Sequence, residues 1–518
     1  MTPRPDRQSW PWRFRVACGL LLALRKPDFQ AARTFAHRRF PHVSLIRRGS
    51  RFAKWALHQM CTIIPDAMRH MTIDPNVSRD PMWLCDPNPL ANHPWQHHPD
   101  ADLPRQSHTV VIGAGFTGAA LAYHWARHAP SDQHMIVIET HDPASGASGR
   151  NEGLVVVGRY FKMVRDTVRD HLAQQRTDLS DTQREQLARQ FADRYCRAAY
   201  HNAQLIAQTV ESEQFDCDYA RAGWVQERQA DDQPALDESV ALAIEHNWTD
   251  WTRISPADAL ERTGMQLNHP AGFSKAAASW HPAKWVYGLL ERALTKSNVS
   301  LFTRTRATRV EPLDPGYRVH TARGPIDVQH LVYATESYTP ALLPRFHDVI
   351  HPMQEQAACG DGGPPAMKPH VGISGAWMFC GRYGPRVLFG SGGSRLPDHQ
   401  AGRNRPSRFL TKFIAGELKR LFGPYQLHMT HEWSGTVGYT PDQFPIVGCV
   451  DQHAAYIIAG MCGSGSAVSF NAARCIVNRI LQRTSEPDDY PEPYFAPTRL
   501  LDPQHHVWPD IDHEGSSK

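Results

Sequence analysis

Three glycines and one glutamate form the clearest chemical pattern in the sequence. Gly113, Gly115 and Gly118 make a GxGxxG motif, and Glu139 follows the last of them by about 20 residues. In such a motif the first glycine permits a tight turn, the second lets the backbone approach a pyrophosphate, and the third lets a helix pack closely on a strand. A carboxylate placed like Glu139 accepts hydrogen bonds from ribose hydroxyls and repels a 2′-phosphate. The pattern predicts a site for FAD or NAD and disfavours NADP.

The neighbouring segments would position this motif as a nucleotide-binding turn. Thr109–Ile112 is an apolar, β-branched run, as expected of a parallel strand that is buried on both faces. Ala119–Ala126 consists largely of helix formers, and the N–H groups at the start of that helix would face the phosphates. Met135–Ile138 is the second strand and ends at the glutamate. Strand, turn, helix and strand together predict an α/β fold with a Rossmann-type domain.

A loop of small residues, Ala144–Gly153, follows the second strand. Here the sequence resembles the family of FAD-dependent oxidoreductases that includes D-amino-acid oxidase, glycine oxidase, sarcosine oxidase and, most similar of these, gamma-glutamylputrescine oxidoreductase. The resemblance implies that the loop runs beneath the flavin, and that Ser148, Arg150 and Asn151 supply donors near the pyrophosphate and the flavin ring. The family often has glycine where this sequence has Glu152. That carboxylate therefore either holds a substrate ammonium group or points to solvent.

A second signature near the C-terminus supports the same resemblance. Trp433–Gly448 matches the family pattern W-x-G…T-x-D-x-x-P-x-x-G. A strand at Tyr456–Gly460, a turn at Met461–Ser466 and a helix at Ala467–Leu481 follow it. The N-terminus of that helix would place N–H groups at the flavin edge where negative charge develops on reduction. Two motifs in the family's order extend the resemblance over roughly residues 82 to 495.

The motifs and the resemblance together assign residues to the site. Those expected at the cofactor are Gly113, Gly115, Phe116, Thr117, Gly118, Glu139, Ser145, Ser148, Gly149, Arg150, Asn151, Val310, Ala334, Gly463, Ser464, Gly465 and Ser466. Arg159, Tyr160 and Trp433 are expected to line the substrate pocket. Glu152 and His281 are the candidate catalytic residues, although a His-Pro turn at a domain junction is often structural. No metal site is expected.

Two departures from the family narrow the chemistry. Members similar to glycine oxidase carry an arginine that binds the substrate α-carboxylate, at the place where this sequence has Val437. A carboxylate needs a charge-assisted partner, so an ordinary α-amino acid is disfavoured unless Arg159 or Arg386 replaces that arginine. Members similar to sarcosine oxidase attach the flavin through a cysteine, at the place of Gly435. Non-covalent FAD is therefore expected, with two nearby cysteines left open as exceptions.

The order of these segments predicts two interleaved domains, as in the glutathione-reductase-like FAD fold. Residues 1–81 are expected to form a basic N-terminal arm or helical extension, and residues 496–518 a tail. The expected FAD-binding domain comprises residues 82–215, with a helical insertion at 160–215, together with residues 281–344 and 433–495. The expected substrate domain, built on an antiparallel sheet, comprises residues 216–280 and 345–432.

Composition and charge exclude several classes of protein. At 518 residues and 41% hydrophobic content, the chain is long enough for two or more globular domains. Ten cysteines without a CxxC pair indicate neither a zinc site nor a disulfide framework, which fits a reducing compartment such as the cytoplasm. The positive charge is concentrated in residues 1–54, and the remainder is net acidic. This distribution argues against a nucleic-acid-binding protein.

The basic arm has three open interpretations. Its longest apolar run, Val16–Leu24, is shorter than the about 20 residues that a membrane-spanning helix needs. The run ends in Arg25 and Lys26 without the cleavage site of a secretory signal. The arm is then a basic amphipathic segment on an anionic membrane surface, an organellar transit peptide, or a helical subdomain packed on the body. The expected location is cytoplasmic, peripheral at a membrane in the first case and organellar in the second.

These features lead us to expect an FAD-dependent oxidoreductase. It would oxidise the C–N bond of an amine or amino-acid-like substrate by hydride transfer to flavin N5, and the imine would then hydrolyse. Electrons would pass on to oxygen or to a membrane acceptor. The alternative is an FAD-bound assembly factor for a membrane complex, with little or no catalysis, and an open, substrate-sized cavity would favour the enzyme. A weaker rival is a dehydrogenase of hydroxy acids.

Overall fold

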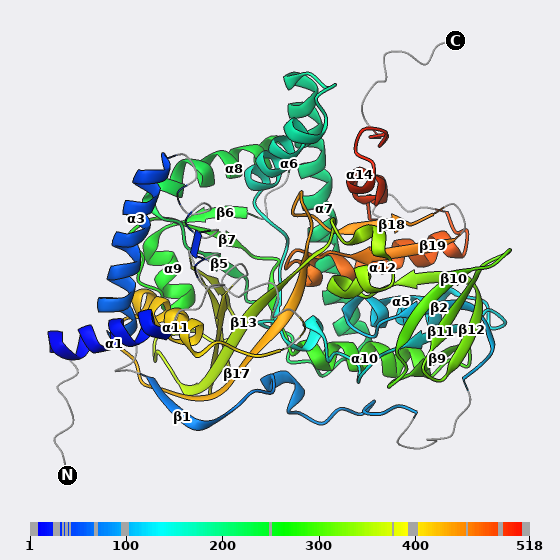
Figure 1. Ribbon diagram of the computed structural model, residues 1–518, viewed down its shortest axis with the longest axis horizontal. Coiled ribbons are helices and arrows are strands. Elements are labelled where there is room, and N and C mark those ends of the chain that lie inside the picture. The colour runs from blue at the N-terminus through cyan, green and yellow to red at the C-terminus, as the bar shows by residue number, and fades with distance from the viewer. Residues whose placement is uncertain are drawn as a thin grey trace.

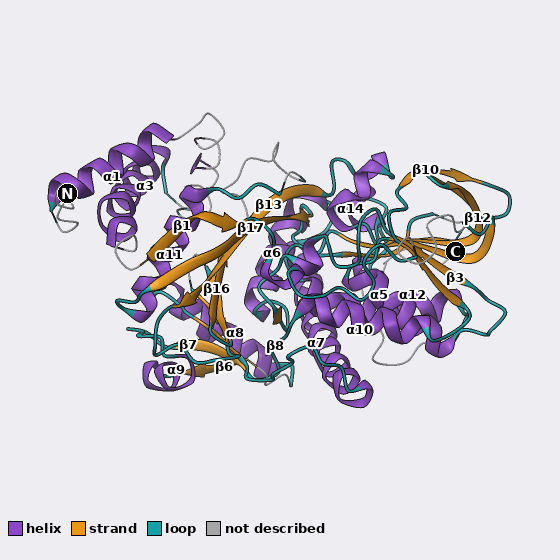
Figure 2. Cartoon of the chain, turned by 90° about the horizontal axis from the view of Figure 1, so that it is seen from below, coloured by secondary structure: helices purple, strands orange, loops and turns teal. Residues whose placement is uncertain are grey.

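Two β-sheets, each built from segments far apart in the sequence, divide the molecule (Figure 1). The computed structural model describes residues 9–23, 43–66, 71–94, 103–247, 251–375, 378–391, 404–451, 454–484 and 490–509, together with residues 29, 32, 33, 36, 40 and 402. An eight-stranded sheet lies on the right of Figure 1 and a nine-stranded sheet on the left, and Figure 2 shows the same division from below. This mixture of helices and sheets confirms the predicted α/β class.

The eight-stranded sheet carries the glycine-rich turn. Its parallel strands are β2 (Gln106–Ile112), β3 (Met135–Ile138), β9 (Val299–Phe302), β12 (Gly324–Tyr333) and β19 (Ala455–Ala459). Its antiparallel strands are β10 (Ala307–Pro312), β11 (Tyr317–Thr321) and β18 (Ile446–Cys449). The helices α5 (Phe116–His128), α10 (Pro282–Leu294) and α12 (Gly465–Ile480) pack on it. Because β3 is buried along its whole length, it is apolar without alternation.

The nine-stranded sheet lies beside the first, in the strand order β1-β17-β13-β16-β15-β14-β5-β7-β6. Its strands are β1 (Met71–Ser78), β5 (Trp224–Gln226), β6 (Trp251–Ile254), β7 (Ala271–Ser274), β13 (His351–Gly362), β14 (Gly372–Ser374), β15 (Phe379–Tyr383), β16 (Arg386–Ser391) and β17 (Leu427–Tyr439). The helix α11 (Arg408–Phe422) packs on β16, where Ile414 and Leu418 share a buried apolar core with Phe389. The long strand β17 therefore brings the W-x-G signature into this sheet.

Helices and short elements connect and cover the sheets. Four helices follow β4 and precede β7 in the sequence: α6 (Phe161–Gln175), α7 (Asp181–Glu213), α8 (Gln233–Glu245) and α9 (Pro256–Thr263). The short elements are η2 (Met82–Leu84), η3 (Ala147–Gly149), η4 (Ala230–Asp232), η5 (Glu336–Ala341), η6 (Pro344–Phe346), the pair β4 (Leu154–Val155) and β8 (Ala278–Ser279), α13 (Glu492–Phe495) and α14 (Thr498–Leu501). The segment expected as a helical insertion forms α6 and α7, and Ser180 and Gln183 cap α7 reciprocally.

The N-terminal arm folds onto the nine-stranded sheet. It contains α1 (Trp10–Ala23), α3 (Leu45–His58) and η1 (Gln59–Ile63), and it then adds β1 to the edge of the sheet beside β17. Asp66 anchors it, because its carboxylate meets the Arg13 guanidinium at 2.7 Å and the Lys419 ammonium of α11 at 3.2 Å. Of the three interpretations, the described part of the arm takes the form of a helical subdomain. Residues 1–8, most of 24–42 and the tail residues 510–518 lie outside the described residues.

Candidate active site

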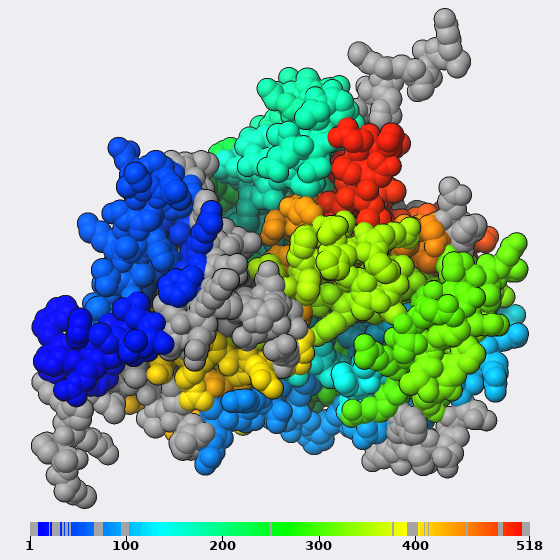
Figure 3. All heavy atoms as spheres, in the orientation of Figure 1, coloured from blue at the N-terminus to red at the C-terminus, as the bar shows by residue number. Residues whose placement is uncertain are grey.

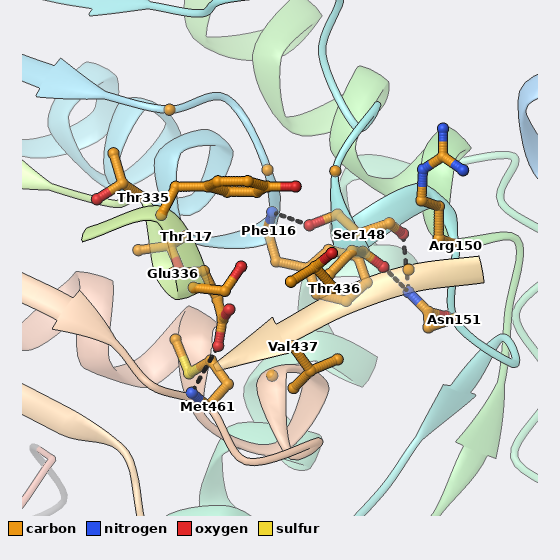
Figure 4. A pocket seen from close by; sticks show the side chains of 18 of the residues that line it. Phe116, Thr117, Ser148, Arg150, Asn151, Thr335, Glu336, Thr436, Val437 and Met461 are labelled. Atoms are coloured by element: carbon orange, nitrogen blue, oxygen red, sulfur yellow. Dashed lines mark hydrogen bonds between the residues drawn. The ribbon is translucent and has the colours of Figure 1, made fainter. Parts of the chain in front are cut away.

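A cavity of about 820 Å³ is lined by both sheets and by the loops that connect them. Ligand pockets span roughly 300–1,000 Å³, so this cavity suits a ligand of dinucleotide size. The glycine-rich turn, Glu139 and the loop Ala144–Gly153 supply one side, and β13 and β17 supply the other. Figure 4 shows part of this lining, with Phe116 and Ser148 from the nucleotide-binding side opposite Thr436 and Val437 from β17.

Each glycine of the motif has a neighbour that excludes a side chain. Gly113 has a φ of +110°, and a Cβ atom there would lie 2.6 Å from the Ala334 carbonyl oxygen. A Cβ atom on Gly115 would lie 2.7 Å from Ser148 Oγ, which accepts a 2.8 Å hydrogen bond from the Phe116 N–H. Gly118 does not line the cavity, since it packs the helix against the Gly113 carbonyl. The helix α5 thus begins at the cavity wall, with Gly115 as its N-cap.

The predicted ribose-binding carboxylate is held firmly at the end of β3. The two oxygens of Glu139 accept 2.9 Å hydrogen bonds from the N–H groups of Ala114 and His141. Burial raises the pKa of this carboxyl, and these backbone donors act against the rise. Nearby, Ala307 and Thr308 line the cavity, whereas Val310 does not and packs instead against the apolar core beneath β10. The expected contact of Val310 is therefore replaced by residues at the start of the same strand.

The polar side chains of the loop after β3 mainly hold the loop itself. Arg150 donates through Nε to the Ser145 carbonyl at 2.9 Å and through Nη1 to the Ser434 carbonyl of β17 at 3.1 Å. Asn151 Nδ2 donates to the Ser148 carbonyl at 2.8 Å. Ser145, Ser148, Arg150 and Asn151 all line the cavity, but Gly149 is covered by Leu84. The loop is thereby braced internally and fixed to β17 of the nine-stranded sheet.

The C-terminal turn presents a second helix N-terminus to the cavity. Gly463, Ser464, Gly465 and Ser466 line it, as does Ala334, which follows β12. The N-cap residue, Ser464, makes no capping hydrogen bond with its side chain, and the first turn of α12 begins at the cavity wall. Glu336 fixes this turn, because its carboxylate accepts 2.8 Å hydrogen bonds from the N–H groups of Met461, shown in Figure 4, and of Gly438. Burial raises the pKa of Glu336 to about 7.

The part of the cavity beyond this turn carries charged and aromatic side chains. Its acidic residues are Glu152, from the loop after β3, and Glu355, from β13. Burial, and then repulsion by Glu355, raise the pKa of Glu152 to about 8. Arg159 donates to the Cys462 carbonyl at 3.2 Å and lies over the Phe444 ring. Trp224, Phe379, Val437 and Tyr439 complete this region, and Arg386 lies outside it.

Three residues expected in the substrate pocket or in catalysis do not line the cavity. Tyr160 is buried against Trp251, with ring centroids 4.3 Å apart. Trp433 is buried and donates from Nε1 to the Arg150 carbonyl at 2.8 Å, so it supports the loop from behind. His281 caps α10 by accepting from the Lys284 N–H, and its other ring nitrogen lies 3.1 Å from Asp86. Their side chains are engaged in packing and capping, so these three expectations are corrected.

The donor set fits a flavin dinucleotide. Two helix N-termini, those of α5 and α12, open onto the cavity, and such termini attract phosphate and other negative charge. The glycines at positions 113 and 115 form a cradle that a Cβ atom would fill, and the Glu139 carboxylate lies beside it, where it accepts from the Ala114 N–H. These features meet the needs of a pyrophosphate, a ribose and a flavin ring in one continuous space.

Comparisons with known proteins agree with this geometry. Residues 108–479 match the family model described as FAD dependent oxidoreductase. The probable oxidoreductase OrdL of Rhizobium meliloti is 21% identical over 393 residues, which cover 74% of this chain and 85% of that protein. L-proline dehydrogenase from P. horikoshii has a TM-score of 0.60 at 16% identity, over 77% of this chain and 98% of its own. Glycine oxidase from Geobacillus kaustophilus has a TM-score of 0.59 at 15% identity, over 78% and 99%.

The TM-scores of 0.60 and 0.59 establish a shared fold, and at 16% and 15% identity these solved structures establish no more than the fold. The family match covers most of the chain. Together with the glycine cradle and the two helix N-termini, the family match identifies the cofactor as FAD. The chain belongs to the family of FAD dependent oxidoreductases.

Proposed function

We propose that this enzyme oxidises a C–N bond in a small amine. The observation that carries the proposal is the lining of the cavity beyond the cofactor cradle, where Glu152 and Glu355 provide carboxylates and Trp224 and Phe379 provide apolar walls. Relatives of the same fold are named glycine oxidase, L-proline dehydrogenase and L-amino acid deaminase, and each takes an amino compound. FAD supplies the hydride acceptor when it is bound.

The protein's own contribution is to bind the amine, exclude water and receive a proton. An amine must lose its ammonium proton before a hydride can leave the α-carbon, because the nitrogen lone pair drives that step. The Glu152 carboxylate lies in the cavity, and its pKa of about 8 is in the range where a side chain exchanges protons efficiently near neutral pH. We therefore assign Glu152 as the acceptor of that proton, and no catalytic role to His281.

Val437 disfavours an ordinary α-amino acid as the substrate. An α-carboxylate requires a guanidinium or another strong donor, and Arg159 is the guanidinium that lines the cavity near Tyr439. One of its donors is already directed to the Cys462 carbonyl. Arg386 lies outside the cavity lining and 3.9 Å from Asp361. If the substrate were an amino acid, its binding would have to depend on Arg159.

The role of an FAD-bound assembly factor gains no support from this cavity. Acidic and aromatic residues from both domains line it beyond the cofactor cradle, as an enzyme of small molecules requires. The proposal is tested with a reactive amine that carries deuterium at the α-carbon. Slower flavin reduction with the deuterated amine, and release of a carbonyl product, are expected. Equal rates in a reaction limited by flavin reduction, or a product in which the C–N bond is intact, would overturn the proposal.

We also propose that the arm touches an anionic membrane surface, where an electron acceptor other than oxygen would be reached. Most of the exposed large apolar side chains in the described part of the chain belong to the arm, namely Trp10, Phe14, Leu21, Leu22, Phe29, Leu45, Ile46 and Leu57. On α3 these lie beside exposed Arg47, Arg51 and Lys54. Figure 3 shows α1 and α3 at one corner of the molecule.

An apolar strip beside a basic strip is typical of helices that lie in the headgroup region of an anionic bilayer. No helix in the described residues is both long and apolar enough to cross a membrane, so the proposed contact is peripheral. The whole described arm would dock as one unit, because Asp66 fastens it to Arg13 and Lys419.

A further inference from the structure

One carboxylate joins the turn before α12 to the nine-stranded sheet. Glu336 begins η5, after β12, and each of its two oxygens accepts a 2.8 Å hydrogen bond, one from the Met461 N–H (Figure 4) and one from the Gly438 N–H. Met461 begins the cavity-lining turn, whereas Gly438 belongs to β17. Glu336 itself lines the cavity. A single side chain therefore holds segments of both sheets in one arrangement at the cavity wall.

The strand order explains how this side chain reaches both segments. Because β12 and β19 are neighbouring parallel strands, Glu336 and Met461 follow them at the same edge of the sheet. Gly438 pairs with Pro352 of β13, which has no N–H to donate. The Gly438 carbonyl accepts a 2.9 Å hydrogen bond from the Cys462 N–H instead. Both polar groups of Gly438 thus bond to segments that follow strands of the eight-stranded sheet.

The backbone is specialised on both sides of this contact. Glu336 has a φ of +48°, in the left-handed region that residues other than glycine rarely adopt. A Cβ atom on Gly438 would lie 3.1 Å from both Glu336 oxygens and 2.9 Å from Ile350 Cγ2, so the glycine lets the carboxylate approach the strand. Backbone strain of this kind persists where the surrounding structure over-determines it, often at functional sites. It marks Glu336 as a candidate for a functional role.

The charge of Glu336 is not neutralised by a cation. Among the residues that the structure describes, no lysine, arginine or histidine forms an ion pair with it, and the donors at Met461 and Gly438 are backbone N–H groups. Burial raises the pKa of the carboxyl to about 7, and these N–H groups favour its ionised form. Above that pH the carboxylate places a negative charge on the cavity wall.

Glu336 stands where the cofactor part of the cavity meets the substrate part. Met461 leads to the N-terminus of α12, whereas Val437, next to Gly438, lines the part beyond the turn. When FAD is bound, its ring has to reach this boundary, because the ring takes electrons from the substrate and the cradle holds the dinucleotide phosphates. A negative charge at this boundary opposes the addition of electrons, whereas the helix N-terminus favours it.

We propose that Glu336 is a positioning residue for the FAD-binding turn, and that its negative charge lowers the affinity of bound FAD for electrons. The side chain acts through Met461 and Gly438 and takes no part in the chemical step. A lower electron affinity makes the reduced cofactor a better donor to its acceptor. The inference goes beyond the proposed function, because it depends on the FAD cofactor and holds for an amine or for any other substrate.

The test compares Glu336→Gln with Glu336→Asp at about pH 8.5, where a carboxyl with a pKa of about 7 is ionised. Glutamine keeps the shape of the side chain, but it has no charge and presents an NH₂ group to one of the two N–H donors. Aspartate keeps the charge but is one methylene shorter, so it does not reach both donors. The reduction potential is read by equilibration with a dye of known potential, and FAD affinity by titration of the FAD-free protein.

Both variants should bind FAD at least about 10-fold more weakly, because each loses a charge-assisted hydrogen bond. Glu336→Gln alone should raise the reduction potential, by about 30 mV, which is a 10-fold change in the equilibrium constant of a two-electron couple. In Glu336→Asp that constant should stay within about 3-fold of the unsubstituted protein. The matched control is Glu261→Gln, on the exposed surface of α9, which should change neither the potential nor the affinity.

An unchanged potential in Glu336→Gln would overturn the inference, because a residue that only supports the fold weakens the binding of oxidised and reduced FAD alike. A rise of the same size in Glu336→Asp would also overturn it, since the charge is still present. If Glu336→Gln does not hold FAD, Glu336→Asp decides: an unchanged FAD affinity contradicts the inference, and a 10-fold loss supports it. These readouts do not use an amine, so the proposed function can fail or stand independently.

Discussion

Replacement of Arg499 by alanine should destabilise the protein by about 3–5 kcal/mol, the cost of breaking a buried ion pair by removing one partner. The Arg499 side chain is 1% exposed and Asp442 is 4% exposed. Nε of Arg499 donates to Asp442 at 2.7 Å and Nη2 does so at 3.2 Å. The same guanidinium donates to the carbonyls of Phe495, Phe444 and Pro445 at 2.7 to 2.9 Å.

The size of this effect follows from what the substitution leaves behind. Asp442 would remain buried, the carbonyl oxygens of Phe495 and Pro445 would lose the Arg499 donor, and the Phe444 carbonyl would keep only the Thr440 hydroxyl. Burial, the largest cause, would raise the pKa of Asp442, but Arg499, together with His171 and the Phe444 N–H, lowers it further, and the net pKa is lowered. A lowered folded-state pKa stabilises the protein above the unfolded pKa of about 3.9, and this contribution disappears as the pH falls through the folded value. The difference between the variant and the unsubstituted protein should therefore shrink in acid.

The assay is urea unfolding of the FAD-loaded protein, followed by circular dichroism and by release of the flavin, at pH 7 and at a pH of about 3, which lies below the unfolded pKa of the aspartate. Arg309→Ala is the matched control, because Arg309 is 64% exposed and pairs with Glu311 at the surface, where such pairs contribute about 0–1 kcal/mol. Asp442 lies in the loop between β17 and β18, which belongs to the W-x-G signature and precedes the cavity-lining turn Met461–Ser466. Flavin release should therefore accompany the loss of stability. A loss no larger than that of Arg309→Ala would refute the reasoning.

Three further substitutions or deletions test the site and the arm. Glu139→Ala should weaken FAD binding by about 1–3 kcal/mol, the cost of an unmade buried hydrogen bond, and an unchanged affinity in a flavin titration would remove its ribose role. The ionised form of Glu152 accepts the proton, so kcat/KM should rise with pH through about 8, the pKa that burial and Glu355 give this group, and Glu152→Gln should abolish that rise. A rise of the same size in the variant would assign the ionisation to another group. Deletion of residues 1–58 should release the protein from anionic vesicles in a sedimentation assay, and a full-length protein that never binds them contradicts the membrane proposal.

The parts of the site that sequence could predict are those whose chemistry is local. Gly113, Gly115 and Glu139 stand within one strand-turn-helix-strand unit, and spacing alone relates them to a nucleotide. The turn Gly463–Ser466 follows from a second local signature. In these segments the function is set by backbone geometry, which a short run of residues determines.

The remaining residues depend on contacts between distant segments. Glu336 reaches Met461 across 125 positions of sequence, and no pattern around either residue indicates this hydrogen bond. Arg499 lies in what was expected to be a tail, yet it is buried against the signature loop. His281 was a plausible base by residue type, but its capping of α10 appears only once the helix start is known.

The same limit applies to Glu355, which the sequence did not single out. It is one glutamate in a strand of mixed composition, and its position in the cavity depends on the register of β13 with β17. Val437 could be noticed because the W-x-G signature gave it a reference position, whereas β13 has no such motif. Which side chains share a face of the sheet is known only after the strands are paired in register.

The most direct test of amine oxidation is to mix the FAD-loaded protein anaerobically with a panel of diamines, polyamines, N-methyl amines, monoamines and D- and L-amino acids while recording the flavin absorption band. The account predicts bleaching by amines and weak or no bleaching by α-amino acids; admission of oxygen then shows whether peroxide forms. A folded, FAD-loaded protein whose flavin stays oxidised with every amine would contradict it.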